Sequence, residues 1–236
     1  MIVLAVETAT KTASVALVSE NRLLGEFTVQ TQFTHSQTMM PMLDQMLKQA
    51  GISIEQVDGF AASIGPGSYT GLRIGIAAVK TFGFALNKPV YGIETLLAMI
   101  DQAPWLQGTI LAMMDARRNR VYVAGVKQDG DSKELVLEQQ AMEINDLVAW
   151  MDNQEDPMYL LGDGAEKYKE SLQSGTKKPV FLHGEYATPT ARTIAWRGLE
   201  MLKREEPGDP DEVVPAYLAK TQAERELEER RKKNGN

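Results

Sequence analysis

Residues 63–75 read SIGPGSYTGLRIG and separate a short apolar run from a long one. A short apolar run, a turn with glycine and proline, and a long apolar run predict a strand, a tight turn and a helix. Gly65 and Gly67 permit a positive φ or a close backbone approach, and Ser68 can cap the helix. Because a helix N-terminus presents unpaired N–H groups, these three residues are candidate phosphate-binding residues. The alternative is a capped turn without a ligand.

Two known phosphate-binding motifs come close to this stretch without matching it. A P-loop requires a lysine directly after its second glycine, and none follows Gly71. The dinucleotide fingerprint GxGxxG requires a closer spacing than that of Gly65, Gly67 and Gly71. The apolar run 89–93 does end at Glu94, about where a ribose-binding acid lies in a dinucleotide-binding unit. A dinucleotide-binding domain is therefore the alternative fold.

The composition is that of a globular protein and excludes several kinds of site. The 236 residues, 43% of them hydrophobic, suit one large domain or two lobes. The absence of cysteine excludes disulfides and thiolate ligands, and the only histidines, His35 and His183, argue against a His-based metal centre or a catalytic triad. A net charge of −7 argues against a dominant nucleic-acid surface. No apolar run reaches the roughly 18 residues of a membrane span, so we expect a cytoplasmic protein without membrane contact.

Residues 2–18 and 110–126 share one layout. In each, an apolar run ends at an acid, a polar turn follows, and a second apolar run closes a predicted hairpin. The two acids, Glu7 and Asp115, are 108 positions apart. The later elements also follow in matching order. They are strands 23–30, 57–64 and 89–93 with helices 36–50, 69–86 and 94–101, and then strands 135–141, 158–161 and 179–182 with helices 144–151, 165–174 and 189–203.

This repeat predicts an α/β protein with two lobes of order βββαβαβα, the alternative being two unrelated hairpins. The predicted domains are an N-terminal lobe, residues 1–104, a second lobe, residues 105–218, and a charged C-terminal tail, residues 219–236. By analogy, a doubled lobe of this order is the two-lobed actin-like ATPase (ASKHA) architecture. In that architecture the first acid helps to hold a metal–phosphate group between the lobes, but Glu7 is equally interpreted as a solvated strand end.

Two predicted helices are more apolar than one buried face requires. Residues 71–86 read GLRIGIAAVKTFGFAL, and a helix that is apolar nearly all round is covered on more than one side. The helix at 36–50 carries four methionines, which suit an exchangeable binding surface or a core. We expect an interface with another chain there, and homodimer formation through the same surface in isolation. The predicted interface residues are Met39, Leu43, Met46, Leu72, Ile76, Val79 and Phe82.

Five segments resemble the TsaB (YeaZ) family: VLAVETAT at 3–10, HSQ at 35–37, GPGSYTGLRIG at 65–75, MDAR at 114–117 and PAYL at 215–218. The resemblance covers nearly the whole chain except the charged tail. It implies the actin-like fold, a cytosolic location and a role in forming N6-threonylcarbamoyladenosine next to the tRNA anticodon. It further implies a scaffold or activator that binds the catalytic relative TsaD, with the ATPase TsaE as third component and tRNA reached through the complex.

The resemblance also predicts that the chain itself is not catalytic. The catalytic relative carries an H-x-x-x-H metal pair after its corresponding strand, and here Thr95 and Met99 stand at those places. We therefore expect no catalytic residue, metal or cofactor in the isolated chain, with ATP and Mg²⁺ as candidates for the assembled complex. The alternative function is a self-sufficient enzyme that binds ATP or a dinucleotide through residues 65–71 and Glu7. A peptidase is disfavoured because Ser68 has no histidine near it in sequence.

Overall fold

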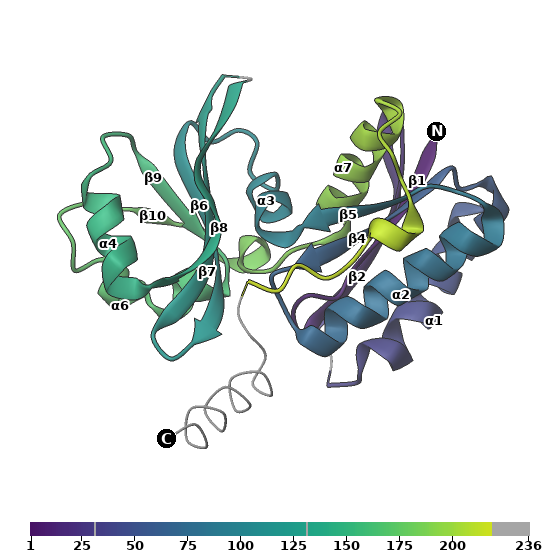
Figure 1. The fold of residues 1–236 in the computed structure, drawn as a ribbon, viewed down its shortest axis with the longest axis horizontal. Coiled ribbons are helices and arrows are strands. Elements are labelled where there is room, and N and C mark those ends of the chain that lie inside the picture. The colour runs from purple at the N-terminus through teal and green to yellow at the C-terminus, as the bar shows by residue number, and fades with distance from the viewer. Residues whose placement is uncertain (31, 131, 219–236) are drawn as a thin grey trace, which may run out of the picture.

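The computed structural model describes residues 1–30, 32–130 and 132–218, which form two lobes, each around a five-stranded sheet (Figure 1). The first sheet has the order β3-β2-β1-β4-β5. Strands β1, β2 and β3 are antiparallel neighbours, and β4 and β5 run parallel to β1. Its strands are β1 (Ile2–Glu7), β2 (Thr12–Ser19), β3 (Arg22–Gln30), β4 (Gly59–Gly65) and β5 (Val90–Glu94).

The second sheet repeats this arrangement. Its order is β10-β9-β6-β7-β8, so β6 holds the central place of β1 and β9 that of β4. Its strands are β6 (Gly108–Arg117), β7 (Arg120–Asp129), β8 (Ser132–Glu143), β9 (Met158–Leu161) and β10 (Val180–Phe181). The matching orders confirm the predicted repeat and the two-lobed actin-like fold. Glu7 and Asp115 lie at corresponding places, at or near the carboxyl ends of the two central strands.

Helices cover both faces of the first sheet. On β1, Leu4 and Val6 point to the side of α1 and α2, whereas Val3 and Ala5 point to α7. The helices are α1 (His35–Ala50), α2 (Tyr69–Leu86), α3 (Thr95–Ile100), α4 (Ile144–Asp152), α5 (Asp163–Lys167), α6 (Lys169–Leu172) and α7 (Ala191–Lys203), with 3₁₀ turns η1 (Ile54–Gln56), η2 (Gly184–Ala187) and η3 (Pro210–Glu212). None of the helices within the described residues is both long and apolar enough to cross a membrane.

One helix changes lobes and another lies between them, because α3 contacts β4 and β5 as well as β6 and β7. The sequence order assigns α7 to the second half, but α7 covers the first sheet, and α3 of the first half contacts β6 and β7 (Figure 1). The fit of α7 on this sheet is close, since a Cβ at Gly198 would lie 2.8 Å from Ala61 Cβ. The assignment of 189–203 to the second lobe was therefore wrong. Apart from this helix, the predicted domains, residues 1–104 and 105–218, remain a prediction.

The local elements otherwise follow the sequence pattern closely. Helix α2 spans 69–86 as predicted, from the Ser68 cap to Asn87, which adopts the left-handed conformation at φ 52°. The predicted helix 165–174 is instead two short helices, interrupted at Tyr168. The charged tail, residues 219–236, lies outside the described residues.

Candidate functional site

The glycine-rich stretch holds α2 tightly against the turn between β1 and β2. A Cβ at Gly67 would lie 2.5 Å from Ala9 Cβ, and one at Gly71 would overlap the Thr8 carbonyl oxygen. Hydrogen bonds join the same segments: Ser68 N donates to Ala9 O at 2.7 Å, and Thr8 Oγ1 donates to Gly71 O at 2.8 Å. These glycines are therefore required for backbone approach.

Packing and helix capping are enough to explain why glycine and serine occupy the predicted phosphate-binding positions, and no bound ligand is needed to explain them. Gly65 has φ 123° and lies against the C-terminal segment, where its Cβ would be 2.8 Å from Ala216 O. Ser68 Oγ accepts from Gly71 N at 3.2 Å, as an N-cap does. Because the N–H of Ser68 is already bonded to Ala9, phosphate binding by Gly65, Gly67 and Ser68 stays a prediction.

Glu7 is buried, so its interpretation as a solvated strand end was wrong. Its side chain is fully inaccessible, and burial raises the pKa of Glu7 to about 7 against the smaller lowering effects of the Ala9 N–H, the Ser63 hydroxyl and the Thr8 N–H. Oε1 accepts from Ala9 N at 2.5 Å, while Oε2 has no hydrogen-bond partner among the described residues. Burial therefore favours the protonated, neutral form of the Glu7 carboxyl group in the folded protein.

Glu7 belongs to a set of buried polar side chains near the first turn of α7. Its register partner Ser14 accepts from Ala191 N at 3.0 Å, which places this edge of the sheet under α7. Among the described residues, the hydroxyl oxygens of Thr95 and Thr190 in this set have no hydrogen-bond partner. Sequence reasoning missed this set because its members come from β1, β2, β4, α3 and the N-cap of α7.

The acid of the second lobe has a different environment. Asp115 is partly exposed; its Oδ2 pairs with Lys167 Nζ at 2.5 Å, and its Oδ1 accepts from Arg117 N and from Tyr168 Oη. Burial by itself favours the neutral acid, but Lys167, Arg117 N–H and Tyr168 together hold the pKa of Asp115 below its ordinary value. The two acids are thus not equivalent. The described residues contain no group of three or more His, Cys, Asp or Glu side chains suited to hold a metal.

The second hairpin turn carries the arginines seen in the sequence. Arg117, Arg118 and Asn119 all have positive φ, at 63°, 53° and 60°. Arg117 and Arg118 are exposed, and Arg120 lies 3.5 Å from the Glu143 carboxylate. The turn is therefore a tight hairpin turn whose residues adopt the left-handed conformation, and the side chains of Arg117 and Arg118 reach solvent.

The predicted interface residues are mostly inside the protein, and this prediction needs correction. Of the seven, Met39, Leu43, Met46, Leu72, Ile76 and Val79 are at most 5% exposed, and Phe82 is half-buried against Phe60. They face the first sheet, because the most strongly apolar stripe of each helix is the one that packs on the core. They are not available to a partner.

Other apolar residues of α1 and α2 do reach the surface. Phe84 is 57% exposed and Met40 43% exposed. We call the accessible apolar set the outer face of α1 and α2; it consists of Met40, Ile74, Ala77, Ala78, Phe84 and Ala85. On α2 these positions recur at helical spacing and form a stripe that faces away from the sheet.

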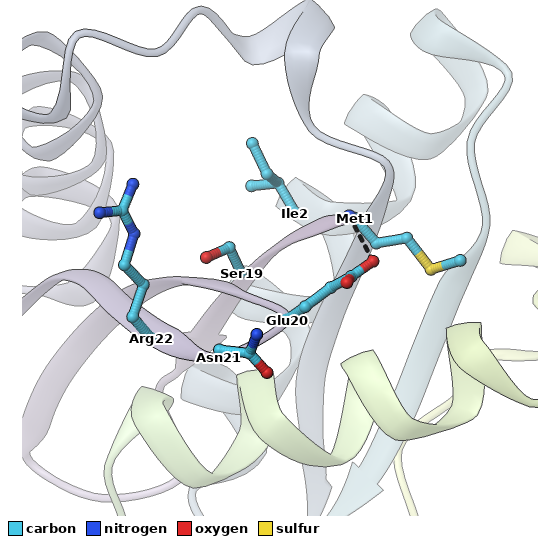
Figure 2. A pocket seen from close by; sticks show the side chains of 6 residues that line it. All are labelled: Met1, Ile2, Ser19, Glu20, Asn21 and Arg22. Atoms are coloured by element: carbon cyan, nitrogen blue, oxygen red, sulfur yellow. Dashed lines mark hydrogen bonds and ion pairs between the residues drawn. The ribbon is translucent and has the colours of Figure 1, made fainter.

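Two further regions can be compared with the glycine-rich turn: the positions of the relative's metal ligands, and a surface hollow. Thr95 and Met99, which stand where the catalytic relative has its metal ligands, are fully buried in α3. A shallow hollow of about 420 Å³ lies at the opposite end of β1 from Glu7 (Figure 2). There the amino group of Met1 is 3.1 Å from the Glu20 carboxylate, and Figure 2 shows Arg22 turned away from this pair. The hollow is thus separate from the glycine-rich turn.

Comparison with known proteins places this fold. Residues 29–227 match the sequence model of the family described as TsaD, tRNA N6-adenosine threonylcarbamoyltransferase. The tRNA threonylcarbamoyladenosine biosynthesis protein TsaB of Bacillus subtilis (strain 168) is 26% identical over 226 residues, 95% of this chain and 96% of that protein. The chain belongs to the TsaB (YeaZ) family. The Escherichia coli (strain K12) TsaB is 34% identical over 145 residues, 58% of this chain and 62% of that protein.

Solved structures agree with this membership. YeaZ from Pseudomonas aeruginosa superposes with a TM-score of 0.76 at 26% identity, over 92% of this chain and 99% of that one. A protein with similarity to peptidase YEAZ from the same organism gives 0.80 at 27% identity with the same coverage. As a TsaB-family protein, the chain has a role in the biosynthesis of threonylcarbamoyladenosine in tRNA.

Proposed function

We propose that this chain is a non-catalytic scaffold and activator that binds a TsaD-type enzyme, which transfers the threonylcarbamoyl group to the adenosine next to the tRNA anticodon. A TsaE-type ATPase completes the complex. The chain acts on tRNA indirectly, through the assembled complex. The complex forms in the cytoplasm, with ATP and Mg²⁺ entering at the assembled stage. Support comes from the family membership and from one structural observation: α2 keeps an apolar outer face although its inner side already fills the core.

The outer face is the proposed contact with the enzyme. Large aromatic side chains that stay exposed beside small apolar neighbours are typical of protein interfaces. Phe84 is exposed beside Ala85, and Ala77 and Ala78 leave room for another helix to approach. In the absence of the enzyme, a second copy of the chain uses the same face to form a homodimer.

Binding assays with outer-face variants test the proposal. Phe84→Asp and Ala77→Asp each introduce a charge into the contact, so we expect the complex with a TsaD-type enzyme to dissociate and modification of tRNA in a reconstituted reaction to fall. Leu135→Asp, a matched change at a residue 51% exposed on β8, should leave both unchanged. Light scattering after size exclusion measures the complex. Wild-type binding by both outer-face variants would refute the proposed surface.

A further inference from the structure

A clamped arginine lies beside the outer face. Arg73 is exposed on α2, and its guanidinium carbon is 4.0 Å from the centre of the Tyr69 ring. Arg73 Nε donates to Tyr217 Oη at 3.0 Å. The rings of Tyr69 and Tyr217 stack at 5.1 Å. Two aromatic side chains, one of them 144 positions away, thus fix a side chain that is usually mobile at a surface.

Tyr217 is held in place by the C-terminal segment that carries it. Residues 206–217, which we call the strap, begin beside β5, where Val90 N donates to Gly208 O at 3.0 Å. The strap then passes Lys80, whose Nζ is 3.4 Å from Val213 O, and reaches β4 at Ala216, whose N donates to Ile64 O at 2.7 Å. Its final contacts bring Tyr217 onto the first turn of α2.

The contacts with Tyr69 and Tyr217 leave the terminal nitrogens of Arg73 without a carboxylate partner. In the part of the chain that the structure describes, no carboxylate pairs with Arg73, although the sequence has 32 acidic and 25 basic residues. The guanidinium fork matches a carboxylate in two parallel hydrogen bonds. Because the side chain is already ordered, a partner's acid would bind it with little further loss of conformational entropy.

The position of Arg73 indicates which partner supplies the acid. Arg73 directly precedes Ile74 and lies one helical turn before Ala77, so it borders the outer face. A subunit that covers this face would also cover Arg73 and exclude water from it, which strengthens a charge pair. We propose that Arg73, oriented by Tyr69 and Tyr217, binds an Asp or Glu side chain of the enzyme subunit that docks on the outer face. This inference rests on the proposed function.

The test measures affinity for the TsaD-type enzyme. Arg73→Gln should weaken binding about 10- to 100-fold, because it leaves the partner's acid covered and unpaired. Arg73→Lys keeps the charge but loses the fork, so binding should fall by less. Tyr217→Phe keeps the stack and removes the hydrogen bond to Nε, with an expected loss of about threefold. Arg22→Gln, the same charge change on β3, is the matched control and should bind normally.

The outcomes separate this inference from the function on which it rests. If Arg73→Gln binds like wild type while Phe84→Asp does not, the inference fails and the proposed docking face stands. If neither variant affects binding, both fail. If Arg73→Gln spares enzyme binding but weakens tRNA binding by the assembled complex, the anion is a phosphate and the inference is wrong.

Two further measurements identify the acid. Arg73→Glu should abolish binding, and replacing the contacted Asp or Glu of the enzyme by Lys should restore it. The tail contains other candidates, including Glu224 and Glu226. A chain that ends at Leu218 should therefore bind the enzyme as tightly as the full chain. Tighter binding after truncation would indicate that Arg73 pairs with an acid of its own tail, and it would overturn the proposal.

Discussion

Replacement of Glu7 by Gln should stabilise the protein, and only above acidic pH. The buried carboxyl group has a pKa raised to about 7 from the ordinary 4.5, chiefly by burial. Each pH unit between these two values is worth ~1.4 kcal/mol, so ionisation of Glu7 costs the folded state about 3 kcal/mol. A glutamine has the same shape, and its Oε1 can still accept the hydrogen bond from Ala9 N.

The sign follows from the order of the two pKa values. Below pH 4.5 the carboxyl group is protonated in both the folded and the unfolded chain, and it costs nothing. Between pH 4.5 and 7 the unfolded chain releases the proton while the folded chain keeps it, so the free energy of unfolding falls as the pH rises. Above pH 7 both states are ionised and the loss is constant. The advantage of Glu7→Gln should therefore be near zero at pH 4 and about 3 kcal/mol at pH 8.

Urea unfolding at pH 4, 6 and 8 measures this difference, with Glu138→Gln as a control at an exposed position on β8. The control should differ little from wild type at every pH. If the new side-chain amide N–H of Glu7→Gln has no acceptor, the free energy of unfolding falls equally at all three pH values. The pH dependence of the difference from wild type stays the same. A free-energy difference between Glu7→Gln and wild type that does not change with pH would refute the buried, proton-retaining carboxyl group.

Three other predictions concern the glycine-rich turn, the inner helix face and ligands. Gly71→Ala should lower the free energy of unfolding by about 1–3 kcal/mol, because its Cβ overlaps the Thr8 carbonyl, whereas Thr70→Ala should change it little by thermal unfolding. Leu72→Asp, 1% exposed in wild type, should unfold the chain rather than only release a partner, as circular dichroism would reveal. Calorimetric titration with ATP and with NAD should give no saturable heat for the isolated chain; a saturable signal would favour the self-sufficient enzyme.

Much of the fold could be predicted because local pattern and local packing agree. The strand, turn and helix around Gly65–Gly71 were predicted with their correct order, since glycine, proline and a capping serine mark these boundaries in sequence. The packing of α7 on the first sheet could not be predicted in this way. It depends on contacts between residues far apart in the chain, such as Gly198 and Ala61.

The interface residues were misplaced for a related reason. On a helix that is apolar nearly all round, hydrophobicity does not say which stripe faces the sheet. The inner stripe of α2 contains Leu72, Ile76 and Val79, and the outer one contains smaller side chains with Phe84 at the end. Glu7 was misjudged likewise. The polar turn after it predicts exposure, but its register partner Ser14 is bonded to Ala191 of α7, more than 180 positions later in the chain.

The glycine-rich turn and the strap together explain how a small helix surface could serve as a docking face. On one side, Gly67 and Gly71 let the β1–β2 turn press against the start of α2; on the other, Tyr217 stacks on Tyr69. The start of α2 is thus held by segments from both ends of the chain. A helix fixed in this way loses little conformational entropy when a partner binds, so even a face built largely of Ala and Ile can contribute net affinity. If the proposed docking is correct, the glycines and the strap affect binding by fixing the position of α2, and Gly67 and Gly71 need no contact with the partner.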